Sequence, residues 1–327
     1  MTQTIRWGII GVGDVTEKKS GPGFQQAQHS QLVAVMRRNA AKAEDYAHRH
    51  GVPFWTTDAR KLIHHPEVDA VYIATPPDSH CSYTEHVAAA GKPVYVEKPM
   101  ARTYVECQTM INACEAAGVP LFVAYYRRAM PRFERVRQLI AEGHLGNVRS
   151  VHITLQRPAS AQDTSSPKPW RVLPDIAGGG YFVDMGSHTL DLLDWLFGPI
   201  QEVHGIAHNH AGNYPAEDAV SAAFSFENGI LGSGRWCFNA FKQHDEVVIT
   251  GDTGELRFSC FDETPLRLET PDGHTHINAP YPEVVQQPLI QQIVDTLNGV
   301  GSCSSTGQTA ARTNQVIDSI LATYRSL

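Results

Sequence analysis

The sequence predicts an α/β protein in two parts: a doubly wound parallel sheet at the N-terminal end, then an α+β part with a large, mainly antiparallel sheet. In the first third of the chain, runs that are apolar on both faces alternate with helical stretches, which is typical of a parallel sheet covered on both sides. After about residue 146 the strands follow one another without crossover helices, which indicates antiparallel pairing. The 327 residues suit about two domains. We expect them at 1–125 and 126–327, with the final helices able to pack back on the first.

The first part contains five apolar runs that we interpret as strands of the parallel sheet: Trp7–Val12, Leu32–Met36, Ala70–Ala74, Val94–Val96 and Leu121–Ala124. Helical segments lie between them: Ala40–His50, Ser79–Ala90 and Tyr104–Ala117. Two of these helices are followed by glycine and then proline, at Gly91 and Pro93 and at Gly118 and Pro120. This order stops a helix just before the next strand begins.

The second part begins with the predicted strand Val148–Leu155, which no crossover helix follows. The next segment, Gln156–Ile176, is a loop of about 20 residues, a length typical of functional or mobile loops. Helical spacing returns at Phe182–Phe197, and an Asn-Gly pair at 228–229 predicts a hairpin. Further strands are expected at Ala219–Phe226, Ile230–Cys237, Glu246–Thr250, Leu256–Ser259 and Leu266–Leu268, and closing helices at 284–298 and 309–325.

Composition and charge exclude several classes of protein. The formal net charge of −7 gives a mildly acidic surface that repels phosphate backbones, so nucleic acid is not an expected partner. No apolar run reaches the roughly 18 residues of a membrane span, and the N-terminus enters a strand without a signal peptide, so we expect no membrane association. The six cysteines lack a C-x-x-C pair, which favours reduced thiols and a cytoplasmic location. The histidines show no metal-ligand spacing, so we expect no metal.

The residues after the first predicted strand match part of a dinucleotide-binding fingerprint. Gly11 and Gly13 match the first two glycines of G-x-G-x-x-G, and Asp14 and Val15 open the next helix, where backbone N–H groups bind a pyrophosphate. Thr16 stands in place of the third glycine. An ordinary glycine turn is the plain alternative, but a position in the first βα turn of the chain favours a cofactor.

The helix after this turn is predicted to be interrupted. Ser20–Gly23 contains two glycines and a proline, so we expect the helix to stop after one or two turns. The interruption is either a local kink or a way for Lys18 or Lys19 to reach a phosphate or the substrate.

The end of the second predicted strand carries Arg37 and Arg38. A fold specific for NAD usually places Asp or Glu there to bind the ribose hydroxyls, whereas arginine accommodates a 2′-phosphate. The absence of an acid and the presence of two arginines favour NADP, with NAD as the alternative. The plain reading is a solvated arginine pair.

Polar residues follow two later strands of the predicted parallel sheet. Thr75, Pro76 and His80 lie after one of them, and Glu97, Lys98 and Pro99 lie after the next. Ligands bind in such sheets at the carboxyl ends of the strands. Together with the stretch Gly179–Asp191, these motifs resemble those of the glucose–fructose oxidoreductase, inositol dehydrogenase and rhizopine-catabolism (Gfo/Idh/MocA) family. The resemblance covers nearly the whole chain.

The resemblance implies roles for particular residues. Lys98 is similar to the family's lysine beside nicotinamide and the reacting oxygen, and its bond to Pro99 is expected to be cis. Asp184 and His188 match the pair that completes the site, with His188 as the proton donor or acceptor. The expected substrate contacts are Tyr126, Arg127, Trp170, Arg171, Tyr181, Asp184 and His188, although relatives often have Asn where this chain has Tyr125-Tyr126. The expected cofactor contacts are Gly11, Gly13, Asp14, Val15, Arg37, Arg38, Thr75, Pro76, His80, Glu97 and Lys98.

Elementary chemistry agrees with these catalytic roles. Asp184 and His188 are four residues apart, so on a helix they share one face. When a hydride moves between carbon and nicotinamide, a proton must move on the adjacent oxygen, and histidine titrates in the range that this needs. The ammonium of Lys98 would stabilise negative charge on that oxygen. The plain alternative is that Asp184 caps the helix and His188 only packs.

The sequence thus predicts an NADP-preferring oxidoreductase that acts on a secondary alcohol or ketone of a sugar, polyol or related cyclic compound. Two alternatives come from other classes of protein in the same family: a redox-neutral, NAD-dependent glycosidase, and a regulator that senses a dinucleotide without turning it over. Antiparallel sheets with an exposed face often associate, so we expect a homodimer or homotetramer.

Overall fold

The computed structural model describes residues 2–326 and divides the chain into two compact units. The first unit comprises the chain up to Met130 together with Pro282–Ala311, and the second comprises Pro131–Tyr281 together with the chain from Arg312 onward. Each unit therefore takes segments that are far apart in the sequence.

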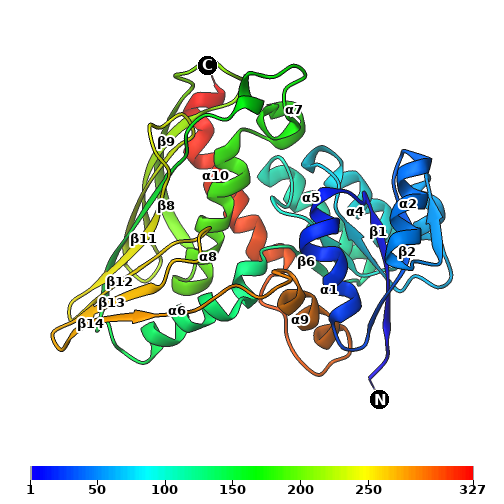
Figure 1. Cartoon of the computed structure of the whole chain (residues 1–327), viewed down its shortest axis with the longest axis horizontal. Helices are drawn as coiled ribbons and strands as arrows, with labels where there is room; N and C mark the ends of the chain where they lie inside the picture. The colour runs from blue at the N-terminus through cyan, green and yellow to red at the C-terminus, as the bar shows by residue number, and fades with distance from the viewer. Residues whose placement is uncertain (1, 327) are drawn as a thin grey trace. The chain divides into compact units, whose positions relative to one another are not determined.

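A six-stranded parallel sheet forms the centre of the first unit (Figure 1). Its strands lie in the order β3-β2-β1-β4-β5-β6. Their bounds are β1 Ile5–Ile10, β2 Ser30–Met36, β3 Phe54–Thr56, β4 Ala70–Ile73, β5 Val94–Val96 and β6 Leu121–Val123. The chain order reverses between β1 and β4, which is the switch point where doubly wound sheets bind ligands. β3 was not predicted.

Helices cover this sheet, as the alternating pattern predicted. They are α1 Gly21–Gln26, α2 Ala40–His50, α3 Ala59–Ile63, α4 His80–Ala89, α5 Tyr104–Ala117 and α9 Gln287–Leu297. The predicted interruption at Ser20–Gly23 is wrong: a π-helical turn, Thr16–Ser20, runs directly into α1. Gly21 and Gly23 allow close approach instead, because a Cβ on Gly21 would lie 2.2 Å from Thr16 O and one on Gly23 would lie 2.8 Å from Ile290 Cδ1 of α9.

The second unit is built on an eight-stranded sheet in the order β14-β13-β12-β11-β7-β10-β9-β8. All its strand pairs are antiparallel except β7 with β10. The strands are β7 Val148–Gln156, β8 Ile200–His208, β9 Ala219–Phe226, β10 Leu231–Cys237, β11 His244–Gly251, β12 Glu255–Phe258, β13 Leu266–Thr270 and β14 Gly273–Ile277. Asn228 and Gly229 form the predicted hairpin turn between β9 and β10.

The second unit also contains α6 Pro131–Ala141, α7 Pro174–Ala177, α8 Ser187–Phe197 and most of α10 Gly307–Arg325. In Figure 1, α8 and the later turns of α10 lie along one face of the eight-stranded sheet. The predicted helix Phe182–Phe197 has two parts, a π-helical turn at Phe182–Gly186 and then α8. The predicted loop Gln156–Ile176 is mostly irregular and contains two short 3₁₀ turns, Ala161–Thr164 and Trp170–Val172.

The predicted fold class is thereby confirmed, with a parallel sheet followed by a mainly antiparallel one. None of the helices within residues 2–326 has the length and apolar character needed to cross a bilayer. Nor do three or more His, Cys, Asp or Glu side chains gather as metal ligands anywhere in that range.

Candidate active site

The glycine turn after β1 has the backbone geometry of a dinucleotide cradle. Gly11 has φ +93°, and a Cβ there would lie 2.6 Å from Thr75 Cγ2 and 3.0 Å from Thr75 N, so only glycine fits. A Cβ on Gly13 would meet only Gly11 O, at 3.9 Å, which leaves open space above the turn. Thr16 replaces the third glycine and closes the turn, because Gly13 N–H donates to its Oγ1 at 2.8 Å. These residues fit a pyrophosphate at the start of a helix.

Arg37 and Arg38 lie where β2 ends, beside this turn. Gly11 N–H and Val12 N–H both donate to Met36 O, which joins the two segments. Arg37 is half-buried and Arg38 is exposed. Within the part of the chain that the structure describes, neither guanidinium forms an ion pair.

His80 connects the loops that follow β4 and β5. Its Nε2 lies 2.8 Å from Thr75 O, and its Nδ1 lies 3.2 Å from Pro99 O and 3.1 Å from Met100 O. Burial lowers the pKa of His80, despite opposing contributions from these carbonyl groups. The side chain is fully buried, so the structure places it behind the Thr75 and Pro99 loops rather than on their surface.

Glu97 lies at the centre of a buried hydrogen-bond network beneath Lys98. Its Oε1 accepts from Tyr72 OH at 2.5 Å and from Gln286 Nε2 at 2.7 Å, while its Oε2 accepts from Lys98 N–H at 3.0 Å. Gln286 in turn accepts from Tyr95 OH at 2.9 Å. Both carboxyl oxygens are thus occupied within the protein. The Lys98–Pro99 bond is cis, as the resemblance implied.

Tyr126 and Arg127 follow β6 in a 3₁₀ turn, Tyr126–Ala129. The Arg127 guanidinium carbon lies 5.1 Å from the centre of the Tyr126 ring. Burial alone would raise the pKa of the Tyr126 phenol, but the charges of Arg127, Lys19 and Lys98 outweigh it and lower the pKa. These predicted positions therefore share one cationic region of the first unit.

Gln286 was not predicted, and replacing it tests the network under Lys98. In Gln286→Leu, Tyr95 OH loses its acceptor and Glu97 loses one of its donors, so we expect the free energy of unfolding to fall by about 1–3 kcal/mol per unsatisfied group. Urea denaturation measures this change. The matched control is Gln291→Leu in α9, the helix that Gln286 precedes; the hydrogen bonds of Gln291 are mainly at the surface, so this variant should change stability by only about 0.5 kcal/mol. Equal losses in the two variants would contradict the network.

In the second unit, three predicted residues gather before and within the π-helical turn. Arg171 Nε lies 3.4 Å from Asp184 Oδ2, and its guanidinium carbon lies 4.3 Å from the centre of the Trp170 ring. His188 lies in the first turn of α8, is 4% exposed, and packs edge to face with Phe261. A half-buried carboxylate paired with arginine and a nearly buried histidine are thus presented by one short segment.

Tyr181 joins the segment that carries Asp184 to the long loop before it. Its hydroxyl donates to Asp163 Oδ1 at 2.7 Å, and Asp163 is itself buried in the long loop. This hydrogen bond joins the loop to the segment that carries Asp184. Burial and the bond to Asp163 raise the pKa of the Tyr181 phenol to about 12.

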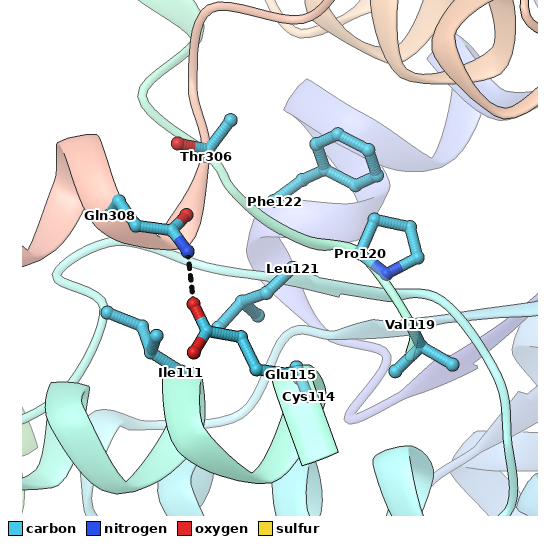
Figure 2. A pocket seen from close by; sticks show the side chains of 9 residues that line it. All are labelled: Ile111, Cys114, Glu115, Val119, Pro120, Leu121, Phe122, Thr306 and Gln308. Atoms are coloured by element: carbon cyan, nitrogen blue, oxygen red, sulfur yellow. Dashed lines mark hydrogen bonds between the residues drawn. The ribbon is translucent and has the colours of Figure 1, made fainter. Parts of the chain in front are cut away.

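A small cavity lies away from all these residues, in the first unit. It has a volume of about 140 Å³ and is bordered by the end of α5, the start of β6 and the start of α10. Figure 2 shows Gln308 and Glu115 joined by a hydrogen bond at its margin. None of the predicted site residues lines this cavity.

Comparison with known proteins gives two family matches that together cover most of the chain. Residues 5–125 match the model of an oxidoreductase family with an NAD-binding Rossmann fold. Residues 133–257 match the model of a GFO/IDH/MocA C-terminal domain.

Individual relatives extend along nearly the full length. Oxidoreductase P35 of Formosa agariphila is 37% identical over 97% of this chain and 98% of its own length. Inositol 2-dehydrogenase of Rhizobium meliloti is 28% identical over 83% of this chain and 81% of its own. A solved structure of levoglucosan dehydrogenase with NADH and levoglucosan has a TM-score of 0.87 at 24% identity, covers 99% of this chain and 98% of that one, and supports the fold alone.

Proposed function

The chain belongs to the GFO/IDH/MocA family of NAD-binding oxidoreductases, and on this basis we propose that it oxidises or reduces a secondary alcohol or ketone of a sugar, polyol or related cyclic compound. A bound dinucleotide would supply the hydride donor or acceptor at nicotinamide C4. The observation that carries the proposal is the hydrogen bonding of the Glu97 carboxyl. It accepts from Tyr72 and Gln286 and from the backbone N–H of Lys98, and so fixes that backbone at the carboxyl end of β5.

We assign the proton chemistry to side chains of this protein. Lys98 stabilises negative charge on the reacting oxygen, and His188 donates or accepts its proton. Asp184 positions Lys98 and His188 and balances their positive charge. The ion pair between Asp184 and Arg171 supports a site that binds a polar substrate. Trp170, Arg171, Tyr126, Arg127 and Tyr181 are the proposed substrate contacts, and the hydroxyl of Tyr181 also donates to Asp163.

The proposed substrate class follows from chemistry shared by the named relatives. Inositol 2-dehydrogenase and levoglucosan dehydrogenase are named for cyclic compounds that carry several hydroxyl groups. The experiment is to screen cyclic polyols, anhydrosugars and aldoses for nicotinamide reduction followed by absorbance. Dinucleotide binding without turnover of any of these compounds, or of the matching ketones with reduced nucleotide, would contradict the proposal.

We propose NADP as the preferred dinucleotide. Arg37 and Arg38 lie at the end of β2 without an ion pair in the described residues, so both are available to a 2′-phosphate. Fluorescence titration should therefore give tighter binding of NADPH than of NADH. Arg38→Ala should weaken NADPH about tenfold and leave NADH nearly unchanged.

Arg60→Ala is the control, because it removes an exposed arginine of α3 and should change neither affinity. The levoglucosan dehydrogenase structure holds NADH, so NAD is the alternative that this titration separates. Tighter binding of NADH by the unaltered protein would overturn the assignment.

We also propose that the protein is cytoplasmic and forms a homodimer or homotetramer through the eight-stranded sheet. Gly205 of β8 contacts Ile320 of α10, so its neighbour Ile206 points to the opposite face of the sheet. Ile206 is 67% exposed and Leu231 of β10 is 62% exposed, which leaves large apolar side chains on that face.

A further inference from the structure

The triple-glycine turn that precedes Asp184 is held from two sides by residues that no motif marked. On one side, Glu217 Oε1 accepts from Gly180 N–H at 2.8 Å. On the other, Arg325 near the end of α10 donates to Gly178 O at 2.5 Å. The π-helical turn starts from the same glycines, because Asp184 N–H donates to Gly180 O at 3.2 Å.

The glycines are required for this arrangement. A Cβ on Gly180 would lie 2.7 Å from Glu217 O and 2.9 Å from Ala216 Cβ, and a Cβ on Gly179 would lie 2.4 Å from Val183 Cγ2. Gly178 has φ +81° and ends α7 in the left-handed conformation. The turn therefore fits against Glu217 so closely that no larger residue could replace these glycines without moving the segment.

We propose that Glu217 is a positioning residue: its buried carboxyl fixes the Gly178–Gly180 turn and thereby the placement of Asp184 and His188. It acts through the backbone of Gly180, whose N–H donates to Glu217 and whose O accepts from Asp184 N–H. The link to catalysis rests on the proposed function, whereas the link to the turn does not.

The surroundings of Glu217 make its attachment of the Gly178–Gly180 turn sensitive to pH. Burial raises the pKa of Glu217 to about 7, although N–H groups of Gly180 and Val183 and the charge of Arg325 oppose the shift. The other titratable groups around it are Tyr214, Asp218 and Tyr324. Opening the turn to water would return Glu217 toward its ordinary pKa, so the closed turn binds the proton more tightly than the open one. Closure is therefore favoured at low pH and is lost progressively as pH rises through about 7.

Amide hydrogen exchange of the full chain tests this without any need for turnover. Peptides covering 178–187 should exchange about tenfold faster at about pH 8 than at about pH 6, after correction for intrinsic exchange rates. Glu217→Gln keeps an acceptor for Gly180 but cannot ionise, so its exchange should be the same at both pH values. Glu217→Ala removes the acceptor and should exchange about tenfold faster or more at both.

Asp218→Asn is the matched control. Asp218 is equally buried but accepts from His210 N–H, Ala211 N–H and Asn239 Nδ2, so its replacement should alter peptides near 208–212 and leave 178–187 unchanged. Exchange of 178–187 that is unaffected by Glu217→Ala would overturn the proposal, and exchange that is independent of pH in the unaltered protein would overturn its pH dependence. If no dehydrogenase activity is found, the exchange result still decides whether Glu217 holds the turn.

Discussion

Lys98→Met should reduce turnover of a confirmed substrate by about 10²- to 10³-fold and lower dinucleotide affinity much less, because Lys98 is only one of several expected cofactor contacts. Methionine is similar in length to lysine but cannot stabilise negative charge on the reacting oxygen. The loop should keep its geometry, because Glu97 Oε2 accepts from the backbone N–H of residue 98 at 3.0 Å and this bond is retained in the variant. Steady-state rates and fluorescence titration of the dinucleotide measure the two effects separately.

The matched control is Lys92→Met, at the opposite end of the same strand. Lys92 precedes β5 and donates to His65 O, whereas Lys98 follows β5. Ligands bind at the carboxyl ends of parallel strands, so Lys92→Met should retain turnover even if it lowers stability slightly. Near-normal turnover in Lys98→Met would remove Lys98 from its proposed role.

The sequence was most informative where a local pattern has a single structural solution. Apolar strands followed by glycine or polar residues located the carboxyl edge of the parallel sheet, where the structure brings Gly11 against Thr75 and joins the Thr75 and Pro99 loops through His80. The Asn-Gly hairpin after β9 is a local signal of the same kind.

Residues that act through distant contacts gave no such signal. Gln286 is separated from Glu97 by 189 positions in the sequence, and a glutamine before an apolar helix predicts nothing about a buried carboxyl elsewhere. Glu217 is 37 positions from Gly180, and only the packed turn shows why glycines are needed there. β8 was missed for another reason: its side chains Gln201, Glu202, His204 and His208 point outward and obscure the apolar pattern.

Like Lys98→Met, His188→Gln should have a large effect: we expect turnover to fall by about 10²- to 10⁴-fold. Glutamine can still form hydrogen bonds in the same space but cannot exchange a proton near neutral pH, so substrate binding should change much less than turnover. We expect the protein to accommodate the replacement. His188 lies in α8, outside the strand pairs of the eight-stranded sheet, and its ring packs edge to face against Phe261. Separate measurement of kcat and KM distinguishes lost proton transfer from lost binding.

His210→Gln supplies the control, since His210 is exposed, stacks on His208 and lies in the loop between β8 and β9. It should retain both kcat and KM. A fall in stability of His188→Gln that matched its fall in activity would favour the plain alternative, in which His188 only packs. Full stability with a lowered kcat and a nearly unchanged KM would instead support proton transfer by His188, because loss of packing at so buried a position should lower stability as well.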